Sequence, residues 1–283
     1  MKKIKIIKLL LILLILLILA LPITYYFLSK DYDLNIKNGT FNCLCQEDKK
    51  YRAEEKGHFS DKLTAKKYLN NNFPEIKYAK VLFETKNPDD LKNFVLPDKF
   101  VMKSTGGARM FHIGNKNDNM KHLIKKAKYF LSIKFSSYGY RSIPFFNFKE
   151  PHYNYNDPKI IIEEFLEDIF EFRIMMAKGK VIYCEKINKQ AEIYDENWDQ
   201  LKDPKHNVIV RPLKKEKPKC FEKILEFCEE FYEKNKFNVV RMDFYLNKEE
   251  TKFYFGEFTF TPENCRKKYS AEFNSRYSRI VNE

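Results

Sequence analysis

The 283-residue sequence predicts an α+β fold preceded by one hydrophobic N-terminal helix. Strand-like hairpins such as FEFRIMMAKGKVIYCEKIN (170–188) alternate along the chain with amphipathic helical stretches such as residues 118–134 and 220–235. Antiparallel hairpins mixed with helices are typical of the α+β class. The leading helix is predicted because no charged residue interrupts residues 9–28.

Residues 1–30 are the first of four predicted parts, a transmembrane anchor. Residues 9–28 match the ~20 apolar residues that cross a bilayer as a helix, and Tyr25 and Tyr26 lie where an interfacial aromatic belt would form. A cleaved signal peptide is the alternative, but its apolar region spans only about 7–15 residues and ends at a small-residue site. Four lysines precede the span and two follow closely, which favours a non-cytoplasmic soluble part.

Charge and cysteine content restrict the class of partner only loosely. The net charge is +13, and residues 31–283 keep +8, because the first 30 residues contain five lysines and no acid. Such a surface favours anionic partners, although a solvated lysine-rich surface explains the same charge. None of the six cysteines has zinc-ligand spacing with histidine.

Residues 31–75 are predicted to form a short helical segment. Its clearest part is SDKLTAKKYLNNNF (60–73), with Ser60 as the predicted N-cap. Residues 76–168 are predicted as the next part, with strands at 78–85, 99–103, 110–114 and 159–167 and a helix at 118–134. The turn STGGAR (104–109) holds the only Gly-Gly pair of the chain.

Residues 169–283 are predicted to contain two hairpins and the helix at 220–235. The second hairpin, VVRMDFYLNKEETKFYFGEFTFTP (239–262), carries Arg241, Asp243, Glu257 and Thr259 in otherwise strand-like runs. Because strand side chains alternate faces, an odd-residue loop places these four groups on one face and a four-residue loop splits them. Two carboxylates and a hydroxyl suit Mg²⁺, and a nearby arginine suits a phosphoryl group. The alternative is an ordinary salt bridge on a solvated sheet.

Two further segments have sites of lower specificity. In KFVMKSTGGAR a lysine ends a strand before a glycine-containing turn, which suits phosphate binding through backbone N–H groups. The alternative is a hairpin turn that needs glycine for positive φ. In IIIEEFLED the strand end offers backbone groups to an adenine edge, and the alternative is a core strand that leaves its sheet.

Taken in order, five segments resemble the ATP-grasp superfamily: SDKLTAKKYL, LPDKFVMKSTGGA, KIIIEEFLED, FEFRIMMAKGKV and the 239–262 hairpin. The resemblance is greatest to the TupA-like branch, named for teichuronopeptide biosynthesis, and covers roughly residues 58–265. It implies an ATP-grasp fold with ATP between two α+β lobes. The N-lobe with its glycine loop would be 76–168, and the C-lobe with a metal-binding hairpin would be 169–283.

The resemblance also implies ATP and Mg²⁺ as cofactors and a role for each matching residue. Two lysines would contact the phosphates, loop 104–108 would close over them, segment 163–166 would face adenine, and Glu171 would reach the ribose. Arg241 would stabilise charge that develops when a carboxylate attacks the γ-phosphate. The implied nucleotide-binding residues are Lys62, Lys103, Ser104, Thr105, Gly106, Gly107, Glu163, Glu164, Phe165, Leu166 and Glu171. The implied metal ligands are Asp243, Glu257 and Thr259, and the implied catalytic residues are Arg241 and Lys103.

Three functions follow from these expectations. The first is an ATP-dependent carboxylate–amine ligase that forms an acyl phosphate and acts on an anionic glycan or glycopeptide, with the membrane as a second partner and no nucleic acid expected. The second is a glycan kinase that uses the same nucleotide site. The third is a non-catalytic, membrane-tethered protein that binds anionic polymer. A need for ATP favours a cytoplasmic soluble part, against the lysine bias.

Overall fold

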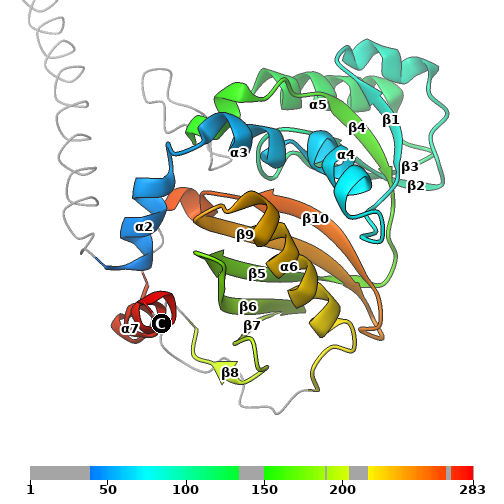
Figure 1. The fold of residues 1–283 in the computed structure, drawn as a ribbon. Coiled ribbons are helices and arrows are strands. Elements are labelled where there is room, and N and C mark those ends of the chain that lie inside the picture. Colours follow the sequence, from blue (N-terminus) through cyan, green and yellow to red (C-terminus); the bar gives the residue numbers. More distant parts are fainter. Residues whose placement is uncertain (1–38, 134–149, 189, 204–215, 266–268, 283) are drawn as a thin grey trace, which may run out of the picture.

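The computed structural model describes residues 39–133, 150–188, 190–203, 216–265 and 269–282. The predicted anchor at 1–30 lies outside these residues, so the anchor stays a prediction. Within the described residues, no helix has the length and apolar character needed to span a bilayer. Figure 1 shows the described chain as two sheets with helices packed around them.

The first sheet has four antiparallel strands in the order β1-β4-β2-β3. These strands are β1 (Val81–Thr85), β2 (Lys99–Ser104), β3 (Phe111–Asn115) and β4 (Ile160–Glu164). One face is covered by α5 (Met120–Ser132) and η1 (Pro88–Asn93), because Phe100, Met102 and Ile162 pack there against Leu123 and Leu91. The other face carries Lys103 and Glu163. Polar side chains therefore lie on the sheet face opposite α5 and η1.

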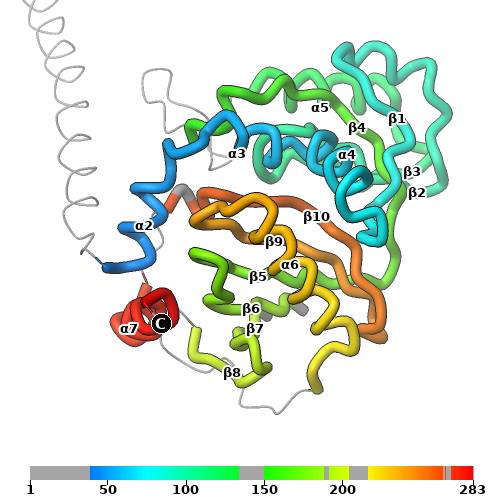
Figure 2. The backbone as a smooth tube through the Cα atoms, viewed as in Figure 1, coloured from blue at the N-terminus to red at the C-terminus, as the bar shows by residue number. Residues whose placement is uncertain are grey.

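The second sheet has six antiparallel strands in the order β10-β9-β5-β6-β7-β8. The strands are β5 (Ile169–Ala177), β6 (Lys180–Asn188), β7 (Gln190–Tyr194), β8 (Gln200–Leu201), β9 (Val239–Asn247) and β10 (Phe253–Thr259). Helix α6 (Phe221–Asn235) packs on one face through Phe227 and Phe231, against Phe172 and Phe244. The chain passes from β4 into β5 through residues 165–168, which connect the two sheets (Figure 2).

Two short helices enter the core ahead of the sheets: α3 (Ala53–Ser60) and α4 (Lys62–Asn72). The predicted N-cap at Ser60 is wrong. Ser60 is the last residue of α3, whereas Asp61 has extended backbone and its carboxylate accepts hydrogen bonds from the N–H groups of Leu63 and Thr64. Asp61 therefore begins α4 and fixes the position of Lys62 at its first turn.

The β9–β10 hairpin has its polar groups on one face, and a β-bulge places them there. Near the turn Phe255 pairs with Phe244, a register that would place Glu257 opposite Met242 and on the wrong face. A bulge at Gly256 shifts the register by one residue, so that Glu257 pairs with Asp243. Loop parity alone therefore does not decide the face, because a bulge and not the loop aligns the carboxylates.

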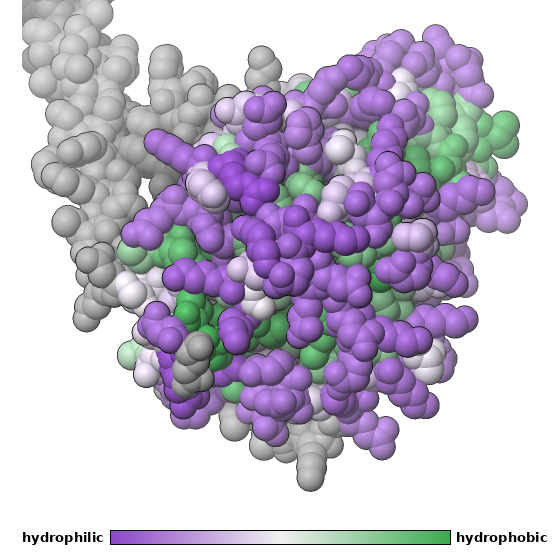
Figure 3. All heavy atoms as spheres, viewed as in Figure 1, coloured by the Kyte–Doolittle hydropathy of each residue, from purple (hydrophilic) through white to green (hydrophobic). Residues whose placement is uncertain are grey.

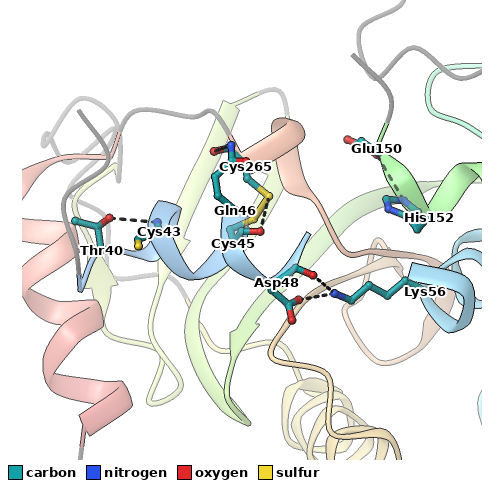
Figure 4. The surroundings of a disulfide bond; sticks show 9 residues. All are labelled: Thr40, Cys43, Cys45, Gln46, Asp48, Lys56, Glu150, His152 and Cys265. Atoms are coloured by element: carbon teal, nitrogen blue, oxygen red, sulfur yellow. Dashed lines mark hydrogen bonds and ion pairs between the residues drawn. A yellow bond between two sulfur atoms is a disulfide. The ribbon is translucent and has the colours of Figure 1, made fainter. Parts of the chain in front are cut away.

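A disulfide joins the start of the described chain to the segment after β10. Cys45 in α2 (Phe41–Asp48) bonds Cys265 in η3 (Pro262–Cys265), and both residues are buried (Figure 4). Helix α2 and helix α7 (Ala271–Asn282) pack together on Met175 and Tyr183. These two residues share a sheet face with Arg241, so the helices close one end of that face.

The hydrophilic character of the outer surface agrees with the high lysine content of the sequence. The face in Figure 3 is mostly hydrophilic, with an apolar patch at the upper right, beside β1. Among the described residues, the exposed large apolar side chains include Val95, Phe111 and Ile113. The latter two lie on β3, on the same sheet face as Lys103.

Candidate active site

Side chains on the polar face of the four-stranded sheet meet side chains of the six-stranded sheet, and we refer to the region between the two sheets as the cleft. Lys103 Nζ lies 5.9 Å from the centre of the Tyr245 ring, so a side chain of β2 reaches across to one of β9. Lys62 makes a second crossing, because its Nζ lies 3.1 Å from Glu257 Oε2. The lysines form the roof of the cleft, and β9, β10 and β5 form its floor.

The Lys103 ammonium forms an ion pair with a buried carboxylate of the roof, Glu163. Lys103 Nζ lies 2.7 Å from Glu163 Oε2, and the other oxygen of Glu163 binds Lys66, which also donates to the Ala79 carbonyl at 2.7 Å. Burial by itself raises the pKa of Glu163, but the two lysines hold it below its usual value. The Glu163 side chain thus orients Lys103. The predicted contact of Glu163 with adenine would therefore be made by its backbone groups and not by its side chain.

The glycine turn packs against the first turn of α4. Thr105 is buried, its carbonyl accepts the Lys62 N–H at 2.9 Å, and its hydroxyl accepts the Lys159 N–H at 3.0 Å. Gly107 has φ +77°, and its carbonyl accepts a hydrogen bond from Lys62 Nζ at 3.0 Å. Ser104 is the buried last residue of β2 and not part of the turn. The predicted loop therefore begins at Thr105, with Gly106 and Gly107 at its centre.

The floor consists of rows of side chains across neighbouring strands. One row runs Glu257, Asp243, Arg173 and Glu185, from β10 through β9 and β5 to β6. The next row runs Thr259, Arg241, Met175 and Tyr183. Sheet pairing therefore brings all three predicted metal ligands and the predicted catalytic arginine onto one surface.

Arg241 and Asp243 form a bidentate ion pair on this floor. Arg241 Nε and Nη2 each lie 2.6 Å from an oxygen of Asp243, and Nη2 also donates to Thr259 Oγ1 at 3.2 Å. Burial raises the pKa of Asp243 to about 6, although Arg241 opposes this. Burial also tends to raise the pKa of Glu257, but the Lys62 ammonium and the Arg241 guanidinium hold it below its usual value.

The two carboxylates fit Mg²⁺. Directly opposed residues on one face of an antiparallel pair have Cβ atoms about 4.5–5.5 Å apart, within reach of one shared ion. Among the described residues, no cluster of three or more His, Cys, Asp or Glu side chains is arranged as a metal site. Mg²⁺ held by one or two carboxylates, phosphate oxygens and water needs no such cluster. Asp243 and Glu257 would hold the ion, and Thr259 stays a predicted weaker ligand.

The residues predicted to face adenine and ribose lie where the two sheets connect. The Glu164 N–H donates to the Lys80 carbonyl at 3.0 Å, which leaves Phe165 and Leu166 as the predicted adenine-facing residues. Glu171 lies on the floor beside Tyr245, where its carboxylate accepts from Arg173 Nε at 2.9 Å. Sequence reasoning missed Tyr245 on the floor and Val101 on the roof, which strand alternation places on the same faces as Asp243 and Lys103. Their offset of two residues from Asp243 and Lys103 was the available signal.

At the opposite end of the cleft lies a buried acid that the sequence did not reveal. Glu150 precedes η2 (Pro151–Tyr155), and its Oε2 lies 3.6 Å from Nε2 of buried His152 (Figure 4). Burial raises the pKa of Glu150 to about 7, with Arg241 and Glu257 among the charges that act on it. Burial lowers the pKa of His152 to about 3.

Two sheets that enclose a cleft, with lysines and a glycine turn above and paired carboxylates below, define an ATP-grasp protein. The chain belongs to the TupA-like ATP-grasp family, whose family model, described as "TupA-like ATPgrasp", matches residues 43–282. This confirms the resemblance read from the sequence. ATP and Mg²⁺ are the cofactors of ATP-grasp enzymes, and ATP-grasp ligases are the wider enzyme class to which the family belongs.

Solved structures with a similar arrangement are distant in sequence. D-alanine–D-alanine ligase from Helicobacter pylori is 14% identical with a TM-score of 0.45, and the match covers 78% of this chain and 61% of that one. The Bacillus anthracis enzyme of the same name is 15% identical with a TM-score of 0.45, covering 79% and 65%. Biotin carboxylase from Campylobacter jejuni, in complex with β,γ-ATP, is 11% identical with a TM-score of 0.46, covering 81% and 47%. The match thus spans less than two thirds of each of these chains, and no curated protein matches.

Proposed function

We propose that the protein is a membrane-anchored ATP- and Mg²⁺-dependent carboxylate–amine ligase that acts in the biosynthesis of cell-surface polysaccharide or glycopeptide. The observation that carries the proposal is the placement of Lys62 and Lys103 opposite Asp243 and Glu257 across one cleft. The family description supports the ATP-grasp chemistry. The net charge of +8 over residues 31–283 suits an anionic glycan or glycopeptide acceptor.

In the proposed reaction an acceptor carboxylate oxygen attacks the γ-phosphorus, and the bond to the bridging oxygen of ADP breaks. An amine nitrogen then attacks the acyl carbon of the resulting acyl phosphate, loses a proton, and phosphate leaves. Lys62 and Lys103 bind phosphate oxygens from the roof, and Arg241 stabilises the charge that develops at the transferred group. The turn at 105–109 excludes water from the acyl phosphate. Mg²⁺, when bound, neutralises phosphate charge.

Hydroxylamine trapping tests the acyl phosphate without knowledge of the natural amine. The full-length protein in detergent is incubated with ATP, Mg²⁺, hydroxylamine and one carboxylate at a time: glucuronate, galacturonate, D-alanine or L-glutamate. We expect ADP and a hydroxamate with at least one of them, and neither product with Asp243→Asn. A phosphate ester that resists hydroxylamine would identify a kinase instead. ATP binding without turnover on any carboxylate would contradict the ligase.

The proposed anchor at residues 9–28 leaves the side of the membrane to be determined. The lysine excess before the span favours a non-cytoplasmic soluble part. The Cys45–Cys265 disulfide favours the same side, since such bonds persist in oxidising compartments. Use of ATP favours the cytoplasmic side. A C-terminal reporter fusion decides between the two, and alkylation of Cys45 in intact cells under non-reducing conditions would contradict the oxidised state.

A further inference from the structure

We propose that Arg173 binds phosphate oxygens of the nucleotide from the floor of the cleft, as a third cationic ligand beside Lys62 and Lys103. The inference rests on the proposed ATP-dependent function. Arg173 lies in the middle of β5. None of the roles assigned so far to lysines, glycines and acids of the site includes it.

The first argument is position. Arg173 pairs with Asp243 of β9 on one side and with Glu185 of β6 on the other, so it lies in the same cross-strand row as the two proposed metal ligands. Glu171 lies two residues earlier on the same face of β5. Arg173 is therefore placed between the predicted ribose carboxylate and the predicted metal carboxylates.

The second argument is the course of a bound nucleotide. In the proposed binding mode, adenine lies at 165–166 and ribose at Glu171, so the phosphate chain begins near Glu171. It ends near the Mg²⁺ proposed at Asp243. The phosphates between those ends pass over Arg173, whose side chain keeps 26% of its surface exposed. An arginine fork matches phosphate oxygens in geometry as well as charge.

The third argument is charge balance on the floor. Arg173 contacts three carboxylates: Nε lies 2.9 Å from Glu171, Nη1 lies 3.1 Å from Glu185, and Nε lies 3.8 Å from Asp243. The other floor arginine, Arg241, is bound to Asp243 through two nitrogens. Since the described floor row holds three acids and one base, Arg173 is the group in that row that offsets the repulsion between these acids and the phosphates.

A purely structural reading is that Arg173 only orients Glu171 toward the ribose. The two readings differ in how the defect depends on phosphate. A phosphate ligand contributes more to ADP than to adenosine, whereas a residue that positions the ribose carboxylate contributes equally to both.

The test titrates adenosine, AMP and ADP, each with Mg²⁺, into the full-length protein in detergent and measures affinity by calorimetry. We expect Arg173→Met to weaken ADP about 10- to 100-fold while adenosine affinity is unchanged, since a hydrogen bond to a charged group has that effect. Arg173→Lys keeps the charge but loses the fork, so we expect a smaller loss with ADP and none with adenosine. Glu171→Gln, the matched control, weakens all three ligands by the same factor.

Equal losses for adenosine and ADP in both Arg173 variants, or unchanged ADP affinity in a folded variant, would overturn the inference. Should Arg173→Met fail to fold, Arg173→Lys gives the same comparison. A wild-type protein that binds neither ADP nor ATP would contradict the proposed function instead, so the two failures are distinguishable.

Discussion

The Lys62 ammonium lies 3.1 Å from Glu257 Oε2 and 3.0 Å from the Gly107 carbonyl oxygen. One side chain thus joins helix α4, the glycine turn and the β9–β10 hairpin. The ammonium contacts an oxygen that the proposed Mg²⁺ would take. In the proposed binding mode, Lys62 moves from Glu257 to a phosphate when Mg²⁺ and ATP enter.

Replacement of Lys62 by Met is expected to change two affinities in opposite directions. ATP affinity falls about 10- to 100-fold, because a cationic phosphate ligand is lost. Affinity for Mg²⁺ alone rises, because no ammonium competes for Glu257. Calorimetric titration of each ligand measures both, and Lys67→Met, an exposed lysine on the same helix, is the control. An unchanged ATP affinity in Lys62→Met would show that Lys62 only bridges the lobes.

Replacement of Lys66 by Met is expected to destabilise the fold by roughly 1–3 kcal/mol, because Glu163 keeps only one of its two cationic partners in a buried position. The double change Lys66→Met with Glu163→Gln also removes the buried carboxylate that has lost a partner and is expected to recover part of that loss. Denaturant unfolding of both variants measures it. Identical stabilities for the single variant and wild type would mean that Lys103 alone compensates Glu163.

The pKa of Glu150 predicts a specific pH dependence of stability. Because burial raises this pKa from 4.5 to about 7, the folded protein binds more protons than the unfolded chain between these values. The contribution of Glu150 to stability therefore falls as pH rises from about 4.5 to about 7. Glu150→Gln removes this loss, so the variant is expected to be more stable than wild type at pH 8, by up to about 3 kcal/mol, and equally stable at pH 4.

Thermal unfolding at both pH values measures the effect of Glu150→Gln, with the exposed Glu54→Gln as control. A variant that is stabilised equally at pH 4 and pH 8 would contradict the titration of Glu150. A variant that is less stable than wild type at pH 8 would indicate that the carboxylate is paired and ionised.

A side chain at Gly256 is predicted to displace neighbouring atoms. A Cβ at this position would lie 2.9 Å from the Asp243 carbonyl oxygen and 3.2 Å from the Tyr245 ring. Gly256→Ala is expected to cost about 1–3 kcal/mol and to displace Glu257 from Asp243, with loss of Mg²⁺-dependent ATP binding. Lys248→Ala, exposed in the turn of the same hairpin, should bind normally. Normal ATP binding by Gly256→Ala would show that the bulge does not align the carboxylates.

Much of the site could be predicted because its residues lie in short, patterned segments. The strand alternation that joins Arg241 to Asp243, and Glu257 to Thr259, is local and was visible in the sequence. The helix at 220–235 was likewise predicted from its apolar periodicity, and α6 spans Phe221–Asn235. The family match confirms the assignment that these segments supported.

The remaining features depend on register and on contacts between distant segments. The Gly256 bulge decides which face Glu257 occupies, and loop length alone does not reveal a bulge. The place of Arg173 between Asp243 and Glu185 follows only from the pairing of β5 with strands β9 and β6. Lys66 was detectable in part, since it lies four residues after Lys62 on the same helix face. The disulfide spans 220 residues, a separation for which the sequence has no signal.

The central claim is that Asp243 and Glu257 together hold Mg²⁺ for a nucleotide bound under the roof lysines. The most direct measurement is ATP affinity of the full-length protein with and without Mg²⁺, for wild type, Asp243→Asn, Glu257→Gln and the exposed hairpin control Glu249→Gln. The account predicts that Mg²⁺ strengthens ATP binding in wild type and in the control, and that this gain disappears in both site variants. An equal gain from Mg²⁺ in all four proteins would contradict it.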